Sequence, residues 1–188
     1  MRYLLLVFLI AACGDDGGGG GPSNELITTV TLDFVPMGGG ATVTAAFSDA
    51  DGDGGDPPVI DPITLMAGTT YTTGVRFANS LETPPEDITI EVADESDEHQ
   101  VFFTGTAIGG PVMHSYLDMD ANGLAIGLSS RIIAARGTGT LIVTLRHLPP
   151  VNGTAVKSAG LAAQVQAGGF ASIGGSSDAS VTFMVTVP

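Results

Sequence analysis

Residues 180–187 read SVTFMVTV, and this stretch indicates the fold class most clearly. Its odd-numbered positions, from Val181 to Val187, are apolar, while Thr182, Met184 and Thr186 lie between them. Alternation with a period of two predicts a β-strand with one apolar face. Similar patterns occur at residues 26–34, 41–48, 69–78, 101–104, 112–117 and 140–147. Such segments, rich in Thr and Val and separated by Gly, Pro and Asp, are typical of an antiparallel β-sandwich.

The sequence has no series of amphipathic helices between these strands, which a parallel α/β sheet would need. We therefore expect an all-β fold, an antiparallel β-sandwich of the Ig-like or Greek-key type with at most one short helix. That helix is expected to begin at residues 83–86, where Thr83-Pro84-Pro85-Glu86 has the form of a capping box. Ile88 and Val92 would pack on the sheet. The β-branched residues 88–90 leave a strand or a loop as the alternative.

A weak internal repeat suggests two similar β units related by duplication. Two acidic loops, at residues 49–54 and 118–123, are offset by 118 − 49 = 69 positions. Two strand ends that contain arginine, Val75-Arg76-Phe77 and Leu145-Arg146-His147, are offset by 146 − 76 = 70 positions. Chance resemblance between Gly-rich hairpins is the alternative explanation.

The first 24 residues predict export and anchoring. Residues 1–12 have a positive start and a short apolar run, which is typical of a signal peptide and too short for the ~20 residues of a membrane span. Small residues before Cys13, the single cysteine, resemble the lipobox of bacterial lipoproteins, so we expect a lipid on Cys13. An ordinary secretory signal is the alternative. Residues 13–24 would form a Gly-rich tether, and residues 25–188 a single β-sandwich domain.

The expected location is the bacterial outer membrane, with the lipid anchor holding the protein to the bilayer. Asp15-Asp16 resembles the acidic export signal of some surface lipoproteins, and both the periplasmic face and the cell surface remain open. The chain has 20 acidic and 6 basic residues, a formal net charge of −14. This excess argues against nucleic acid as a partner, because nucleic-acid binding depends on Lys and Arg.

The two acidic loops have the spacing of calcium ligands, with oxygen-bearing residues at alternate positions before a glycine. The candidate Ca²⁺ ligands are Asp49, Asp51, Asp53 and Asp56 in the first loop, and Asp118, Asp120 and Asn122 in the second. Ile60 and Ser129 stand at the twelfth positions, so neither loop is an EF-hand. The alternative is two plain hairpin turns, since Asp-Gly and Asn-Gly suit such turns. The pattern favours a plain turn for the second loop and leaves both interpretations open for the first.

A second group of candidate metal ligands follows the first acidic loop. Residues 82–98 contain eight carboxylates and no Lys or Arg, and His99 comes next. Glu95, Glu98 and His99 have the donor types that bind Zn²⁺ or Fe²⁺. A solvated charged face is the alternative. His147 and His114 lie on the apolar faces of their strands and are expected to be hydrogen-bonded core or rim histidines, but a meeting of His147 with His99 would favour a metal site.

An enzyme is not expected. The sequence has no Gly-x-Ser-x-Gly elbow, P-loop, Gly-x-Gly-x-x-Gly after a strand or His-Glu-x-x-His, and Cys13 is assigned to the anchor.

Several segments resemble an uncharacterised family of small bacterial lipoproteins labelled "type 1 periplasmic binding fold superfamily". The more specific of them are Asp97-Glu98-His99-Gln100-Val101-Phe102-Phe103 and Leu145-Arg146-His147, and others lie at residues 25–30, 49–59, 118–123 and 140–147. The resemblance implies a lipoprotein context. Its label implies a two-lobed α/β solute-binding protein, and this chain departs from that by being short and β-rich.

The sequence therefore predicts a lipid-anchored cell-envelope β-sandwich that acts as a binding or accessory module, stabilised by Ca²⁺ and partnered with an outer-membrane receptor protein. Two alternatives stay open. One is a lipoprotein that captures a transition metal through Glu95, Glu98, His99 and His147. The other is a purely structural surface protein.

Overall fold

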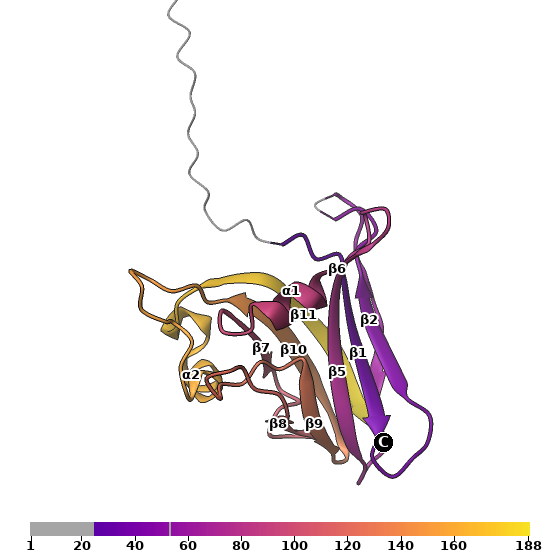
Figure 1. Ribbon diagram of the computed structural model, residues 1–188. Coiled ribbons are helices and arrows are strands. Elements are labelled where there is room, and N and C mark those ends of the chain that lie inside the picture. The colour runs from indigo at the N-terminus through magenta and orange to yellow at the C-terminus, as the bar shows by residue number, and fades with distance from the viewer. Residues whose placement is uncertain (1–24, 53) are drawn as a thin grey trace, which may run out of the picture.

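The computed structural model describes residues 25–52 and 54–188, which fold as two β-sheets packed face to face (Figure 1). The predicted all-β sandwich is confirmed. The predictions for the signal peptide, Cys13 and the tether fall on residues 1–24, which lie outside the described residues, as does Asp53. Within the described residues, no helix has both the length and the apolar character needed to cross a membrane.

The larger sheet has seven strands and the smaller has four. The larger contains, in spatial order, β3 (Val59–Ile60), β2 (Val43–Ser48), β1 (Thr29–Pro36), β5 (Thr70–Asn79), β9 (Ser129–Ala134) and β8 (Val112–Tyr116), with β6 (Glu86–Asp87) on β5. The smaller contains β4 (Ile63–Thr64), β11 (Ser176–Val187), β10 (Gly137–His147) and β7 (His99–Thr104). Neighbouring strands are antiparallel, except that β4 and β11 are parallel.

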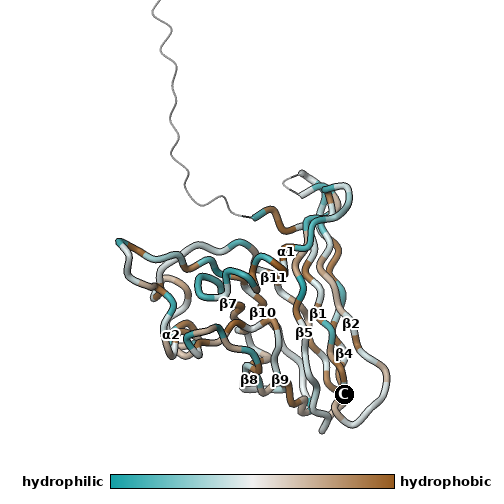
Figure 2. The backbone as a smooth tube through the Cα atoms, viewed as in Figure 1, coloured by the Kyte–Doolittle hydropathy of each residue, from teal (hydrophilic) through white to brown (hydrophobic). Residues whose placement is uncertain are grey.

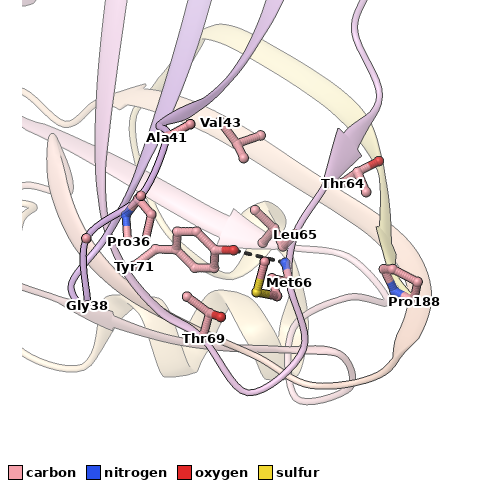
Figure 3. Close-up of a pocket in the computed structure, with 12 residues that line it drawn as sticks. Pro36, Gly38, Ala41, Val43, Thr64, Leu65, Met66, Thr69, Tyr71 and Pro188 are labelled. Atoms are coloured by element: carbon pink, nitrogen blue, oxygen red, sulfur yellow. Dashed lines mark hydrogen bonds between the residues drawn. The ribbon is translucent and has the colours of Figure 1, made fainter.

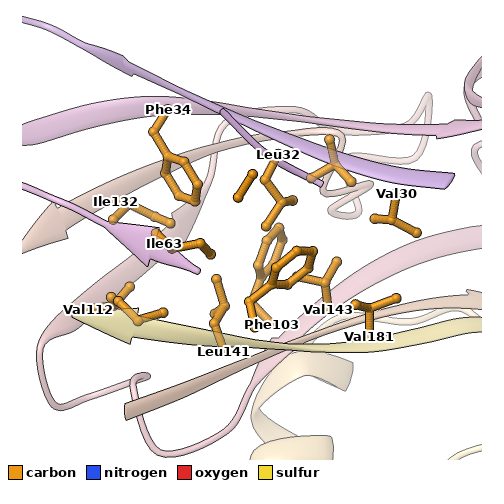
Figure 4. Close-up of a cluster of buried hydrophobic side chains, with 14 of the residues drawn as sticks. Val30, Leu32, Phe34, Ile63, Phe103, Val112, Ile132, Leu141, Val143 and Val181 are labelled. Carbon is orange, nitrogen blue, oxygen red and sulfur yellow. The ribbon is translucent and has the colours of Figure 1, made fainter. Parts of the chain in front are cut away.

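The core lies between the two sheets and contains the apolar residues of the period-two patterns (Figure 4). Val30, Leu32 and Phe34 of β1 are fully buried, and they face the alternate residues of β10 and β11. The buried positions of β11 are Val181, Phe183, Val185 and Val187, as the alternation predicts. Burial of apolar surface is the main favourable contribution to folding, so this inner layer stabilises the sandwich.

The first helix begins later than predicted. Helix α1 (Ile88–Asp94) is capped by Asp87, whose carboxylate accepts a hydrogen bond from the N–H of Thr89. The predicted cap at Thr83 is wrong, because residues 86–87 pair with β5 as strand β6 and hold the chain extended there. Ile88 and Val92 are both buried, as their spacing predicts.

A second helix contradicts the expectation of at most one. Helix α2 (Leu161–Gly168) buries Leu161 and Val165 in a small separate cluster with Phe102 and Leu148, on the outer side of the smaller sheet. A 3₁₀ turn, η1 (Phe170–Ser172), follows it. Leu161 and Val165 are spaced by four residues, which is the helical signal that the sequence contained.

The two segments of the suggested repeat are placed differently in the fold. Strands β1, β2 and β5 of the first segment lie side by side in the larger sheet. In the second segment, residues 109–147, strands β8 and β9 lie in the larger sheet and β10 lies in the smaller. The topology therefore does not reproduce one β unit twice.

Candidate metal centre

His99 and His147 meet in the smaller sheet. They are direct partners in the antiparallel pairing of β7 with β10. Directly opposed side chains lie on the same face of a sheet, and here the two imidazole rings stack with centroids 4.7 Å apart and planes 7° from parallel. His99 is buried, and His147 is slightly exposed. The juxtaposition that would favour a metal site is present.

Two glutamates reach the histidine pair from the turn that joins α1 to β7. The carboxylate Oε2 of Glu95 lies 4.0 Å from Nδ1 of His99, and Oε2 of Glu98 lies 3.5 Å from Nε2 of His147. The turn is closed by hydrogen bonds in which the N–H of Glu95 donates to Glu91 O and that of Glu98 to Glu95 O. All four candidate ligands of the transition-metal prediction are therefore neighbours.

Glu95, His99 and His147 each offer one ligand atom, and these atoms lie within 4.8 Å of one another. Four ligands around Zn²⁺ with bonds of about 2.0–2.1 Å lie about 3.3 Å apart, so metal binding would draw the three side chains together. The Glu95 side chain is about half exposed, whereas His99 is held by the sheet and by a contact of 3.1 Å between its Nδ1 and the carbonyl oxygen of Glu95. Across residues 25–52 and 54–188, this is the one group of three His or carboxylate side chains with such convergence.

The carboxylates of the second acidic loop already have partners within the protein. Both oxygens of Asp118 accept backbone hydrogen bonds, from the N–H groups of Gly127 and Ser129. Asp120 Oδ1 accepts from the N–H groups of Asn122 and Leu124. Its Oδ2 pairs at 2.9 Å with the ammonium of Lys157, and both side chains are buried. The plain-turn interpretation explains these contacts, and Lys157 supplies the positive charge that the prediction assigned to Ca²⁺.

The first acidic loop is exposed. Asp51 Oδ2 accepts the N–H of Asp56, and Asp49 Oδ1 receives a long contact of 3.4 Å from the N–H of Asp51. Asp49, Asp51 and Asp56 do not form a converging ligand group within the described part of the loop, and Asp53 lies outside it. Ca²⁺ binding at this loop stays a prediction.

His114 lies away from the candidate centre. Its Nε2 is 2.9 Å from the hydroxyl of Ser130, and its ring packs against Phe103 with centroids 4.2 Å apart. Burial lowers the pKa of His114 to about 4. His114 is hydrogen-bonded and partly buried, so the prediction of a hydrogen-bonded core or rim histidine is confirmed for this residue.

The low pKa of His114 predicts a loss of stability in acid. Because the unfolded state, with a histidine pKa near 6.5, binds a proton that the folded state does not take up, stability falls as the pH drops from about 6.5 toward 4. Between pH 7 and pH 5 we expect this residue to remove about 2 kcal/mol from the free energy of unfolding. Urea unfolding of the wild type and His114→Gln at both pH values measures it. Equal losses in the two proteins would contradict the assignment.

One carboxylate near the histidines was missed by sequence reasoning. Both oxygens of Asp178, at the start of β11, are buried and have no hydrogen-bond partner among the described residues. The residue stands alone between Ser and Ala residues, and no spacing motif links it to His99 or His147. A pairing irregularity in the sheet brings it there.

A hollow at the opposite end of the sandwich from the histidine pair offers few groups for chemistry (Figure 3). Its volume is about 530 Å³, and Pro36, Leu65, Met66, Tyr71 and Pro188 are among the residues that line it. Among the lining residues, Tyr71 alone has a titratable side chain, and its hydroxyl already accepts a hydrogen bond from the N–H of Met66. Figure 1 places the C-terminus at this end and α1 at the other, so the hollow and the histidine pair are far apart.

Comparisons with protein-family models, with curated proteins and with solved structures find no match to this chain.

Proposed function

We propose that this protein captures a divalent transition metal, Zn²⁺ or Fe²⁺, at a centre built on His99 and His147. The observation that carries the proposal is the convergence of one ligand atom each from Glu95, His99 and His147, which lie within 4.8 Å of one another, with the Glu98 carboxylate beside His147. Nitrogen and carboxylate donors of this kind suit Zn²⁺ and Fe²⁺ better than Ca²⁺, which takes oxygen ligands.

The surrounding charge also supports capture of a cation. The eight carboxylates of residues 82–98 lie on α1 and on the segments beside it, at the same end of the sandwich as the histidine pair. Figure 2 shows several hydrophilic segments at this end, while much of the length of the strands is coloured white or brown. A gathering of one charge sign raises the local concentration of counter-ions and so favours metal entry.

The envelope setting belongs to the same proposal. A lipid on Cys13 and the tether of residues 13–24 would hold the centre at the bacterial outer membrane, where it would deliver metal to, or buffer metal for, a receptor protein there. A chemical role in catalysis is not part of the proposal. The binding or accessory module stabilised by Ca²⁺ and the purely structural surface protein remain predictions from the sequence.

A zinc titration tests the proposed function. The full chain, purified and stripped with chelator, is titrated with ZnCl₂ by calorimetry, and its melting temperature is recorded with and without metal. We expect about one equivalent to bind and the melting temperature to rise, because a ligand that binds only the folded state stabilises it. Absence of both effects would contradict the proposal.

Variants locate the site in the same titration. His99→Asn with His147→Asn should weaken zinc binding by more than the roughly 10- to 100-fold that loss of a supporting contact costs. Glu95→Gln should weaken it by a smaller factor, since Glu95 is the exposed member. Asp61→Asn makes the same charge change at an exposed position outside both the ligand group and residues 82–98, and it should bind zinc like the wild type. Equal binding by all four proteins would place the metal elsewhere.

A further inference from the structure

Asp178 occupies a β-bulge next to the histidine pair. In the pairing of β10 with β11, Leu145 faces Ala179 and Arg146 faces Ser177, so Asp178 is the extra residue between them. His147 faces Ser176 two residues away. Strands β11, β10 and β7 are neighbours in that order, which brings Asp178, His147 and His99 to one end of the sheet. Bulges often redirect a side chain toward a site.

The Asp178 carboxylate lacks the partners that a buried charge requires. Both of its oxygens are shielded from solvent, and neither accepts a hydrogen bond within the described part of the chain. Burial raises the pKa of Asp178, while positive charge on His99, His147 or Arg146 favours its ionised form and Glu91 opposes it. A buried carboxylate without a partner is costly, so a bound cation is its natural complement.

Arg146 does not fill that role. Its guanidinium donates to the carbonyl oxygens of Gly174 and Gly175 and to the hydroxyl of Ser177, and it lies over the ring of Phe170. None of the ion pairs within 4.0 Å among the described residues joins Arg146 to Asp178. The two terminal NH₂ groups of Arg146 therefore make their contacts elsewhere, its Nε is buried without a hydrogen-bond partner, and Asp178 keeps two unused acceptor oxygens.

We propose that Asp178 is a metal ligand that completes the centre, giving a set of two nitrogen and two carboxylate donors with His99, His147 and Glu95. This inference rests on the proposed function. It adds a buried ligand to a set that already includes the exposed Glu95. Asp178 and His99 would hold the metal from within the sandwich, and Glu95 would close over it from the solvent. A four-coordinate site of this composition suits Zn²⁺ and accepts Co²⁺ as a spectroscopic substitute.

The test compares Zn²⁺ affinity and the visible spectrum of the Co²⁺-loaded full chain in the wild type, Asp178→Asn and Asp178→Ser. We expect both variants to bind zinc at least about tenfold more weakly and to change the Co²⁺ absorption bands, because the metal loses a ligand. The metal-free variants should melt at or above the wild-type temperature, since a buried unpaired charge has been removed. Asp61→Asn, the same change at an exposed position outside residues 82–98, is the matched control and should behave like the wild type.

Wild-type affinity and an unchanged spectrum in both Asp178 variants would overturn this inference while leaving the centre on His99 and His147 intact. Failure of the wild type to bind Zn²⁺ or Co²⁺ would overturn the proposed function and the inference with it.

Discussion

Replacing Lys157 by methionine should lower the free energy of unfolding by about 3–5 kcal/mol. The ammonium of Lys157 lies 2.9 Å from Oδ2 of Asp120, with their side chains 1% and 0% exposed. Burial opposes ionisation of Asp120, but hydrogen bonds from Leu124 and Asn122 and the Lys157 charge lower its pKa overall. Methionine keeps the volume and apolar stem of lysine, so the loss comes from leaving the Asp120 carboxylate buried without its counter-charge.

The double variant Lys157→Met with Asp120→Asn separates charge from packing. Asparagine keeps an oxygen for the N–H groups of Asn122 and Leu124, so we expect the pair of changes to recover most of the lost stability. Urea unfolding at pH 7 measures all variants. A loss of less than about 1 kcal/mol for Lys157→Met alone would show that this ion pair does not stabilise the fold.

The Lys157→Met substitution should also affect the metal centre. Lys157 also donates to the carbonyl oxygen of Ser96, which lies in the turn that carries Glu95 and Glu98. Loss of this bond would loosen the turn, so Lys157→Met should weaken zinc binding as well as stability.

The second large effect is expected from Gly175→Ala. Gly175 has a φ of +81°, and a Cβ atom there would overlap the carbonyl oxygen of His147 and come within 2.9 Å of Leu148 Cδ2. The left-handed conformation and the backbone overlap together should cost about 2–5 kcal/mol. Because the overlap involves His147 itself, we also expect weaker metal binding.

Gly153→Ala is the control for the conformational part of this cost. Gly153 has a similar φ of +75°, and a Cβ atom added there would meet no other atom within 4 Å, so only the backbone preference is lost, about 1 kcal/mol. Urea unfolding of both variants gives the comparison. Equal destabilisation by the two changes would show that the contact with His147 is unimportant.

The alternating strands were predictable because one feature, the buried inner face, determines both the pattern and the structure. The inner residues of β1 and β11 follow it throughout. Strand β9 was not predicted, since its Ile132-Ile133 pair interrupts the alternation, with Ile132 buried and Ile133 exposed. The start of α1 was misplaced because the local capping pattern at Thr83 competed with a pairing of residues 86–87 to β5, which depends on the tertiary fold.

The candidate centre was predictable only in part, because only some of its residues are close to one another in the sequence. Glu95, Glu98 and His99 are close in sequence, so they could be recognised there as a group of metal-binding residue types. The contact with His147 depends on the register of β7 with β10, and that of Asp178 on a bulge in β11, neither of which a local pattern encodes. The ion pair of Asp120 with Lys157 was not predictable, because Lys157 comes from a distant segment.

Anomalous diffraction at the zinc absorption edge, from crystals of the zinc-loaded protein, would locate the metal itself. We expect one strong peak at bonding distance from His99 and His147, with Glu95 and Asp178 completing the ligand set. A peak at the exposed loop of residues 49–56, or no ordered peak in fully zinc-loaded crystals, would contradict a metal centre on the histidine pair.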